Sequence, residues 1–327
     1  MAAGGGPGEG SVRTGAVVVS YESRLDLRSC IEKLLEQRPV PQVVVVDNAS
    51  SDGSADLVRE RFGDRVSLLA LADNTGFAGA CNRGLAAFGP EIGMVAFMNP
   101  DVRVQEGCLA ACAETLAADP AIGGIAPRLM RPEGQIVDSV GQVLRRGTLE
   151  VRDRGYGEPL GPELLEERPV LAACGALAVY RREALTAVSS AGCAWAEELF
   201  CFWEDLELGW RMTNQGWRVQ ALPSATAVHG RGAGARRGRG PLRWRRPVEL
   251  EACVISNRWI TLLRHLHRVD LMQRAPVLLA WDLMMTKLSV LRRPRLLAPL
   301  RRRWPLVTGE WRARGTRPQR RLVELPW

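Results

Sequence analysis

The chain has 327 residues, of which 46% are hydrophobic, so it can bury a substantial core in one large domain or two smaller ones. Residues 1–14 are rich in glycine and lack an apolar segment, which excludes a signal peptide there and predicts a disordered lead-in. The eight cysteines form no CxxC pair, so we expect no zinc site and infer reduced thiols in a cytoplasmic protein.

The net charge of +8 is unevenly distributed, because arginine accumulates after residue 230. The clustered arginines are Arg236, Arg237, Arg239, Arg243, Arg245 and Arg246, then Arg292, Arg293, Arg295, Arg301, Arg302 and Arg303. Such an asymmetry favours an anionic partner, either a nucleic acid or an acidic lipid surface.

The first hundred residues alternate short apolar runs with segments of helical spacing. We expect strands at residues 16–20, 43–46, 66–71 and 94–98, and helices at residues 25–35, 54–62 and 76–88. The apolar runs are continuous rather than alternating, which is typical of strands buried on both faces. The predicted fold class is therefore α/β, with a mostly parallel, Rossmann-like sheet flanked by helices.

Polar residues follow these strands, at the edge of the sheet where ligands bind in such folds. They are Ser20 and Tyr21 after the first strand, Asp47 and Asn48 after the second, and Asn99 and Asp101 after the fourth. The turn after the first strand lacks a GxGxxG pattern, so a nicotinamide site is not expected.

Three polar stretches allow both a structural and a functional interpretation. Asp52 can cap the helix that follows it, or the stretch that begins at Asp47 can contact a nucleobase. Residues 74–84 contain three glycines at a helix start, which suggests a close approach of the backbone to another group. Asp101 is either a turn residue or, beside a diphosphate, an oxygen ligand for Mg²⁺ or Mn²⁺.

Residues 199–211 join an apolar and aromatic run to the start of a predicted helix that carries Glu204, Asp205 and Glu207. Acidic residues at a helix N-terminus are favoured by the helix dipole, so they need no functional role. The alternative is a general base that is held among aromatic residues at the rim of a pocket.

Taken in chain order, these stretches resemble the family-two inverting glycosyltransferases of the GT-A fold, and their rhamnosyltransferase-like branch in particular. The matching stretches are residues 17–21, 45–54, 74–77, 82–84, 99–101, 174–182 and 202–208, with Arg211 and His229. Each one is weak by itself, but the ordered set is specific. The resemblance covers residues 16–230 and favours the catalytic interpretation of the acidic pair.

The resemblance implies a role for each matched residue. Asp205 is the expected catalytic base and Glu204 its neighbour. The residues expected to bind the nucleotide-sugar are Ser20, Tyr21, Asp47, Asn48, Asp52, Asn74, Gly76, Asn82, Asn99 and Gly175. Asp101 and His229 are the expected ligands of a divalent metal, Mg²⁺ or Mn²⁺, although a strand-end histidine can also be structural. The family often has a serine after this histidine; here Arg231 or Arg236 would supply charge to the diphosphate instead.

The implied reaction is a single displacement with inversion at the anomeric carbon. Asp205 would take the proton of the acceptor hydroxyl as that hydroxyl attacks. We expect Glu204 and the aromatic residues Phe202, Trp203 and Trp210 to raise the pKa of Asp205.

The expected organisation is a nucleotide-sugar-binding half at residues 15–126, an acceptor-binding and catalytic half at residues 127–246, and a basic amphipathic helical extension at residues 247–327. A strand is expected at residues 171–180 in the second half. The apolar segment 276–291 is too short to span a membrane, which needs roughly 20 residues. The extension either lies on an anionic leaflet, which we favour, or packs against the catalytic domain or another subunit.

The donor sugar remains open between dTDP-rhamnose, a UDP-hexose and UDP-galactofuranose, and the acceptor is expected to be a glycan or a lipid-linked glycan. We expect a peripheral enzyme on the inner face of the plasma membrane that acts in cell-envelope polysaccharide synthesis; an oligomer is possible. A different class, a nucleic-acid-binding protein, would use the arginine-rich tail. That alternative leaves the acids Asp47, Asp101 and Asp205 unexplained, so no nucleic acid is expected as a partner.

Overall fold

The computed structural model describes residues 13–230, 246–315 and 317–326. The strands are β1 (Arg13–Ser20), β2 (Gln42–Asp47), β3 (Ser67–Ala70), β4 (Ile92–Met98), β5 (Val102–Val104), β6 (Ile122–Met130), β7 (Val137–Ser139), β8 (Gln142–Leu144), β9 (Val151–Asp153), β10 (Arg168–Val170), β11 (Leu177–Arg181) and β12 (Arg218–His229). The helices are α1 (Arg24–Leu35), α2 (Ser54–Phe62), α3 (Gly76–Ala86), α4 (Cys108–Ala118), α5 (Arg182–Val188), α6 (Glu204–Asn214), α8 (Val248–His265), α9 (Arg268–Arg292) and α10 (Leu297–Arg312). The expected lead-in lies outside the described residues, except for Arg13 and Thr14, which open β1.

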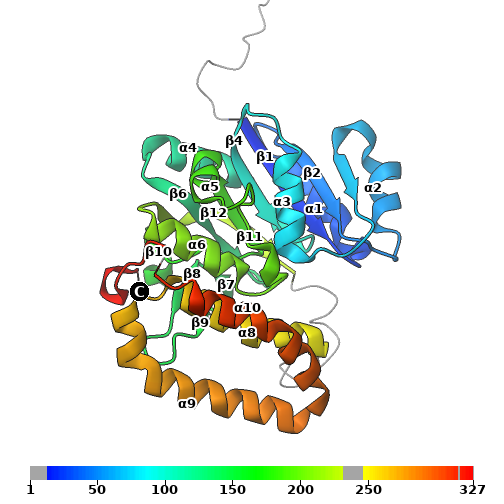
Figure 1. Ribbon diagram of the computed structural model, residues 1–327. Coiled ribbons are helices and arrows are strands. Elements are labelled where there is room, and N and C mark those ends of the chain that lie inside the picture. Colours follow the sequence, from blue (N-terminus) through cyan, green and yellow to red (C-terminus); the bar gives the residue numbers. More distant parts are fainter. Residues whose placement is uncertain (1–12, 231–245, 316, 327) are drawn as a thin grey trace, which may run out of the picture.

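One large sheet forms the centre of the molecule, with helices on both faces (Figure 1). Its main strand order is β10-β12-β6-β11-β4-β1-β2-β3. The pairs β1–β2, β1–β4, β2–β3 and β6–β12 are parallel, whereas β11 runs antiparallel between β4 and β6. The expected α/β architecture is therefore present, and β11 joins the strands of the two expected halves into a single sheet.

The buried strands explain why the apolar runs were continuous. Residues 16–19 and 43–46 are buried on both faces of the sheet, because α1 and α2 cover one face and α3 covers the other. In the expected strand at residues 171–180, only β11 is a strand, and it begins at Leu177. Before it, Ala172 forms only an isolated bridge with Gln142 of β8, and the N–H of Gly175 donates to Asp205.

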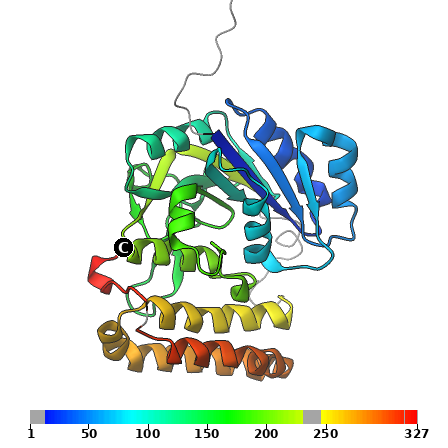
Figure 2. The same ribbon diagram turned by 45° about the horizontal axis from the view of Figure 1, so that its top comes forward.

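Three long C-terminal helices lie together on one side of the sheet domain (Figure 2). The inner helix, α8, buries Ile260, Leu263 and Leu266 against Leu206 and Trp210 of α6. The apolar segment expected at 276–291 is part of the longer helix α9, which begins eight residues earlier and includes Pro276. No helix in the described part of the chain combines the length and the apolar character that a membrane span requires.

Helix α6 packs very closely on the segment before β11. A Cβ atom built on Gly209 would lie 2.4 Å from the carbonyl oxygen of Leu171 and 2.5 Å from the Cβ atom of Ala172. Both distances are shorter than a methyl group tolerates, so this glycine allows the helix that carries Asp205 to approach the segment that carries Gly175.

We expect Gly209→Ala to lower the free energy of unfolding by roughly 1–3 kcal/mol, the usual penalty for overpacking a filled core. Gly309→Ala in α10 is the matched control, since no atom of the described residues lies within 4 Å of a Cβ built there. That control should gain about 0.5–1 kcal/mol from helix propensity. Urea denaturation measures both, and equal stabilities would contradict the close packing of α6.

Candidate active site

A cavity of about 540 Å³ opens at the carboxyl ends of the central strands. The first turn of α6, the segment before β11, the loop before α6 and the end of β12 form its walls. Five residues expected to be functional line it: Asn99, Gly175, Glu204, Asp205 and His229. Further lining residues include Asp138, Gln142, Asp153, Phe202, Trp203 and Arg246.

The carboxylate of Asp205 accepts three hydrogen bonds. Its Oδ2 atom accepts from the backbone N–H of Gly175 at 3.0 Å and from Nε2 of Gln142 at 2.8 Å, and Oδ1 accepts from the N–H of Leu206 at 2.8 Å. Burial raises the pKa of Asp205, and these three donors partly oppose the rise. The result is an oriented carboxylate whose affinity for a proton is higher than usual.

Glu204 is buried beside Asp205, and its Oε2 atom has no hydrogen-bond partner among the described residues. Burial, and then the charge of Asp205, raise the pKa of Glu204 well above its usual value. Burial is the largest cause of the raised pKa at both acids, and the charge of Asp205 adds to the rise at Glu204. The two carboxyl groups therefore interact as a pair, with burial as the dominant effect.

The aromatic surroundings of Asp205 also differ in part from the expectation. Phe202 and Trp203 line the cavity, and the guanidinium of Arg246 lies 4.6 Å above the ring of Phe202. Trp210 instead stacks on His265 of α8 and is fully buried in the cluster beneath α6. It therefore belongs to the contact with the C-terminal helices, because it lies on the opposite face of α6.

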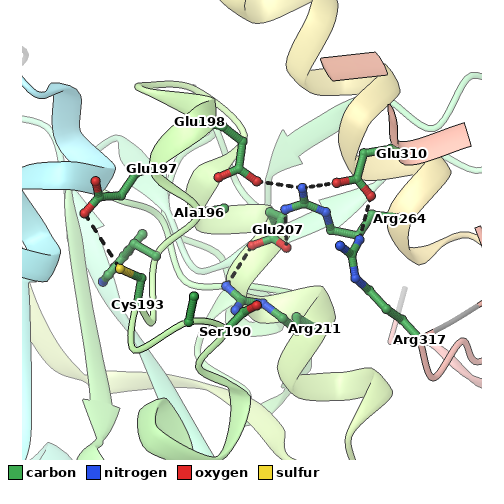
Figure 3. Close-up of a pocket in the computed structure, with 12 residues that line it drawn as sticks. Ser190, Cys193, Ala196, Glu197, Glu198, Glu207, Arg211, Arg264, Glu310 and Arg317 are labelled. Atoms are coloured by element: carbon green, nitrogen blue, oxygen red, sulfur yellow. Dashed lines mark hydrogen bonds and ion pairs between the residues drawn. The ribbon is translucent and has the colours of Figure 1, made fainter. Parts of the chain in front are cut away.

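The third acid of the sequence motif, Glu207, joins α6 to α8. Its carboxylate lies 2.9 Å from Nη2 of Arg211 and 3.1 Å from Nη1 of Arg264 (Figure 3). It also lies 2.9 Å from Nε2 of His265. Burial raises the pKa of Glu207, but the charge of Arg211 and the partners on α8 outweigh burial and hold the pKa well below its usual value. Glu207 is therefore an ionised anchor of α6.

A second cavity, of about 310 Å³, lies beside this anchor. Arg264 connects it to two further acids, Glu198 at 2.7 Å and Glu310 of α10 at 2.5 Å (Figure 3). Arg264 of α8 thus pairs with Glu207 of α6, with Glu310 of α10 and with Glu198 before α6. We interpret this cavity as a part of the helix contact.

His229 and Asp101 converge at the end of β12. Nε2 of His229 lies 3.4 Å from Oδ2 of Asp101, and Nδ1 lies 2.7 Å from Oδ2 of Asp138. Burial lowers the pKa of His229, but its hydrogen bonds with Asp101 and Asp138 outweigh burial and raise the pKa to about 9. No group of three or more His, Cys, Asp or Glu residues suited to a metal occurs among the described residues. A divalent ion here would take its other ligands from a diphosphate and water, as Mg²⁺ usually does.

The donor-side residues occupy the ends of β1 and β2, where Ser20 and Asp47 are neighbours in the strand register. Tyr21 is exposed, whereas Asp47 is buried. Oδ2 of Asp47 accepts from the backbone N–H of Ser50 at 3.0 Å, and Oδ1 has no partner in the described part of the chain. Asp47 therefore holds a buried acceptor atom without a partner among the described residues, near the ligand edge of the sheet.

Asn48, Asp52 and Asn74 organise the backbone around this edge. Oδ1 of Asn48 accepts from the N–H of Thr75 at 2.7 Å, and Oδ1 of Asn74 accepts from the N–H of Gly76 at 2.9 Å. Asp52 accepts from the N–H of Ser54 at 3.0 Å, but the N-cap position of α2 is Gly53, one residue later, so the expected cap at Asp52 is not formed. These contacts fix the loops, and binding of a nucleotide by the same residues stays a prediction.

The glycine-rich start of α3 packs closely against the loop before α6. A Cβ built on Gly76 would lie 2.3 Å from the carbonyl oxygen of Phe200, in the loop before α6. Asn82 exchanges two hydrogen bonds of 2.9 Å with the backbone of Trp195. Both residues therefore hold the segment 195–200 against α3, and their binding of the nucleotide-sugar remains a prediction.

Sequence reasoning missed Gln142 and Asp138, which contact Asp205 and His229. Both lie in the loop-rich region after residue 127, where no periodic pattern marks individual positions. Arg231 and Arg236 lie outside the described residues; Arg246 is the described arginine of that cluster, and it reaches the cavity.

Comparison with known proteins identifies the family. Residues 16–188 match the family described as Glycosyl transferase family 2. An N-acetylglucosaminyl-diphospho-decaprenol L-rhamnosyltransferase of Mycobacterium tuberculosis (strain ATCC 25618 / H37Rv) is 31% identical over 222 residues, which cover 60% of this chain and 68% of the relative.

Solved structures share the fold. The crystal structure of GalNAc-T7 with UDP, GalNAc and Mn²⁺ has a TM-score of 0.59 and 14% identity. The likeness covers 79% of this chain and 49% of that chain, so this chain spans about half the length of GalNAc-T7. S. aureus TarS 1–349 has a TM-score of 0.54, 15% identity, and coverage of 92% and 80%. The mannosyltransferase PcManGT from Pyrobaculum calidifontis, in complex with GDP-Man and Mn²⁺, has a TM-score of 0.50, 19% identity, and coverage of 92% and 74%. These likenesses concern the fold and confirm the predicted GT-A-type architecture.

We expect Glu207→Gln to lower the free energy of unfolding by about 3–5 kcal/mol at pH 7, because it leaves buried cations without their partner. Since the pKa of Glu207 is lowered by folding, its contribution is complete above about pH 4.3, the usual carboxyl value, and is lost as the pH falls through the lower folded pKa. The difference between the two proteins should therefore shrink in acid, as measured by urea denaturation across pH. The exposed pair of Glu32 with Arg28 provides the control: Glu32→Gln should change stability by less than about 1 kcal/mol.

Proposed function

Since the chain belongs to glycosyl transferase family 2, and is therefore a glycosyltransferase that uses a nucleotide-sugar donor, we propose that it transfers rhamnose from dTDP-rhamnose to a hydroxyl of a lipid-linked glycan. The mycobacterial relative supports this choice, because its name specifies a rhamnosyltransferase and a diphospho-decaprenol acceptor. A UDP-hexose or UDP-galactofuranose is the alternative donor. The proposed setting is the assembly of a cell-envelope polysaccharide.

The observation that supports the mechanism best is the geometry of Asp205, an oriented carboxylate at the wall of a cavity beyond the strand ends. In the proposed reaction the acceptor oxygen forms a bond with the anomeric carbon, and the bond from that carbon to the diphosphate oxygen breaks. Asp205 takes the hydroxyl proton, and the nucleoside diphosphate leaves with the electron pair. Gly175 and Gln142 hold the carboxylate in place, and the burial of Glu204 beside it raises the pKa of Glu204.

We further propose that Asp101 and His229 hold a divalent ion, Mg²⁺ or Mn²⁺. Their convergence fits such an ion, and Asp138 supports it by fixing the ring of His229 from its other nitrogen. When bound, the ion would neutralise charge on the departing diphosphate. Two of the similar structures, GalNAc-T7 and PcManGT, are described with Mn²⁺.

The remaining polar residues at the strand ends form the proposed nucleotide side. The free Oδ1 atom of Asp47 is suited to accept a hydrogen bond from a base N–H. The other residues proposed to bind the nucleotide-sugar are Ser20, Tyr21, Asn48, Asp52, Asn74, Gly76, Asn82, Asn99 and Gly175. The proposed division at residues 126 and 246 separates this side from the acceptor side and the helical extension.

The outer face of the C-terminal helices supports peripheral contact with an anionic membrane on the cytoplasmic side. The helix α8 packs on the catalytic domain, which is one of the two arrangements expected for the extension. The outer helices α9 and α10 expose large apolar residues, including Met272, Leu283, Leu291, Leu297, Trp304 and Trp311. They also expose Arg292, Arg295, Arg301 and Arg302. Apolar side chains next to cations suit the boundary of an acidic leaflet.

A role in nucleic-acid binding has little support. Several arginines of the extension are engaged inside the protein, among them Arg258 with Asp282, Arg264 with Glu207 and Arg321 with Asp270. Those side chains are unavailable to phosphates, and the acids around the main cavity would repel a nucleic-acid backbone.

Calorimetry with a panel of nucleotide-sugars tests the donor. We expect dTDP-rhamnose to bind in the presence of Mn²⁺ and to lose affinity in EDTA, and UDP-glucose, UDP-galactose and UDP-galactofuranose to bind more weakly. A DNA duplex serves as the contrast. Absence of donor binding together with salt-sensitive binding of DNA would reject the enzymatic proposal, and preference for a UDP-sugar would reject rhamnose alone.

We expect Asp205→Asn to reduce transfer by roughly 10²–10⁴-fold, the usual contribution of a general base, while the donor affinity is retained. Because asparagine cannot accept on both sides as the carboxylate does, the unfolding temperature of the variant must be measured alongside. A stable variant with normal transfer would show that Asp205 is not the base. A variant that neither folds nor binds donor would make Asp205 structural.

A further inference from the structure

The loop that leads into α6 is held in an unfavourable backbone conformation. Phe200, Phe202 and Trp203 have φ angles of 64°, 66° and 72°, a region that residues with side chains rarely occupy. Such residues are strained and persist only where the surroundings enforce them. Asp205 lies two residues after Trp203, in the first turn of α6. The contacts that hold this loop therefore also fix the start of α6.

One side chain of the C-terminal extension makes the enforcing contacts. Asn257 lies in the middle of α8 and is fully buried. Its Nδ2 atom lies 2.7 Å from the carbonyl oxygen of Leu199, 3.0 Å from that of Cys201 and 2.8 Å from that of Phe202. Three carbonyl groups of the loop therefore converge on a single amide nitrogen.

The orientation of this amide is fixed from its other end. Oδ1 of Asn257 accepts from Nη2 of Arg303 at 2.5 Å, and the same Nη2 donates to the carbonyl oxygen of Glu198 at 3.0 Å. Nε of Arg303 donates to Oγ of Ser256 at 2.6 Å. The side chain of residue 257 thus faces the guanidinium of Arg303 on one side and three carbonyl oxygens on the other. It must accept a hydrogen bond from the first and donate to the second, and an amide group does both.

The opposite side of the loop is held by α3. The carbonyl oxygen of Phe200 points away from Asn257; it accepts from the N–H of Ala78 at 3.3 Å and lies against Gly76. The loop is thus fixed between the donor side of the sheet domain and α8, which lies under α6 (Figure 2).

We propose that Asn257, oriented by Arg303, is a positioning residue that holds the loop 199–203 so that Asp205 faces the acceptor. The proposal rests on the proposed role of Asp205 as the base. It makes the C-terminal extension a part of the active site, because α8 and α10 supply the two side chains that determine the conformation of this loop.

The isosteric variant Asn257→Asp tests the proposal directly. It retains the acceptor for Arg303 but replaces the donor with a carboxylate oxygen that faces three carbonyl groups. We expect kcat to fall roughly 10–100-fold, because small misplacements of a catalytic group have effects of this size. The KM and the Kd for the donor should change far less than kcat, since Asn257 itself makes no contact with the proposed nucleotide side and reaches it only through the carbonyl group of Phe200.

Asn214→Asp is the matched control. Asn214 is also a buried asparagine at the contact between α6 and the extension, and it contacts His265 and the backbone of Arg320 rather than the loop. This control should lower the unfolding temperature and leave kcat unchanged. An equal loss of kcat in both variants would reduce Asn257 to a structural residue and overturn the proposal.

A double-mutant cycle separates the proposal from the function on which it rests. In the background of Asp205→Asn, the change Asn257→Asp should cause no further loss of transfer, because its effect passes through Asp205. Independent, additive losses would overturn the proposal. Full activity of Asp205→Asn would instead reject the proposed base, whatever the result at residue 257.

Arg303→Met provides a second variant should Asn257→Asp not fold. It leaves the amide in place but removes the cation that orients it, so kcat should fall in the same direction, with KM retained. A folded Arg303→Met protein with the kcat of the wild type would overturn the proposal by itself.

Discussion

The carboxylate of Asp205 accepts hydrogen bonds from three segments that are far apart in the sequence, and much of the fold serves to bring them together. Gly175 precedes β11, Gln142 lies in β8, and the third donor belongs to α6 itself. Without these donors, burial would favour the neutral acid. The antiparallel strand β11 is therefore important, because it delivers the N–H of Gly175 to the ligand edge of an otherwise mostly parallel region.

The family, the fold class and the region of the site could be inferred from the sequence, because their signals are local. Continuous apolar runs specify buried strands, and the polar residues after each run lie at a common edge whatever the details of packing. The sequence thus predicts a shared site for four residues, and all of them line the cavity: Asn99, Gly175, Asp205 and His229. Their individual roles remain proposals.

The contacts that shape the site could not be inferred, because they connect positions without a shared pattern. Gln142 is a single polar residue in a loop-rich stretch, and Asn257 looks like an interruption in an amphipathic helix. Its partners are backbone carbonyl groups, which leave no trace in the sequence. The sequence also does not indicate that burial is the largest cause of the raised pKa at both Glu204 and Asp205, since burial depends on the packing around the helix.

The two faces of helix α6 contact different parts of the molecule. One face presents Glu204 and Asp205 to the cavity, and the other buries Glu207 and Trp210 against α8. The C-terminal helices therefore cannot be exchanged among relatives as an independent module, because a new tail would have to match an ionised carboxylate and an indole on the underside of α6. Divergence of the tail and of this helix must proceed together, and the outer faces of α9 and α10 are the surfaces left free to vary.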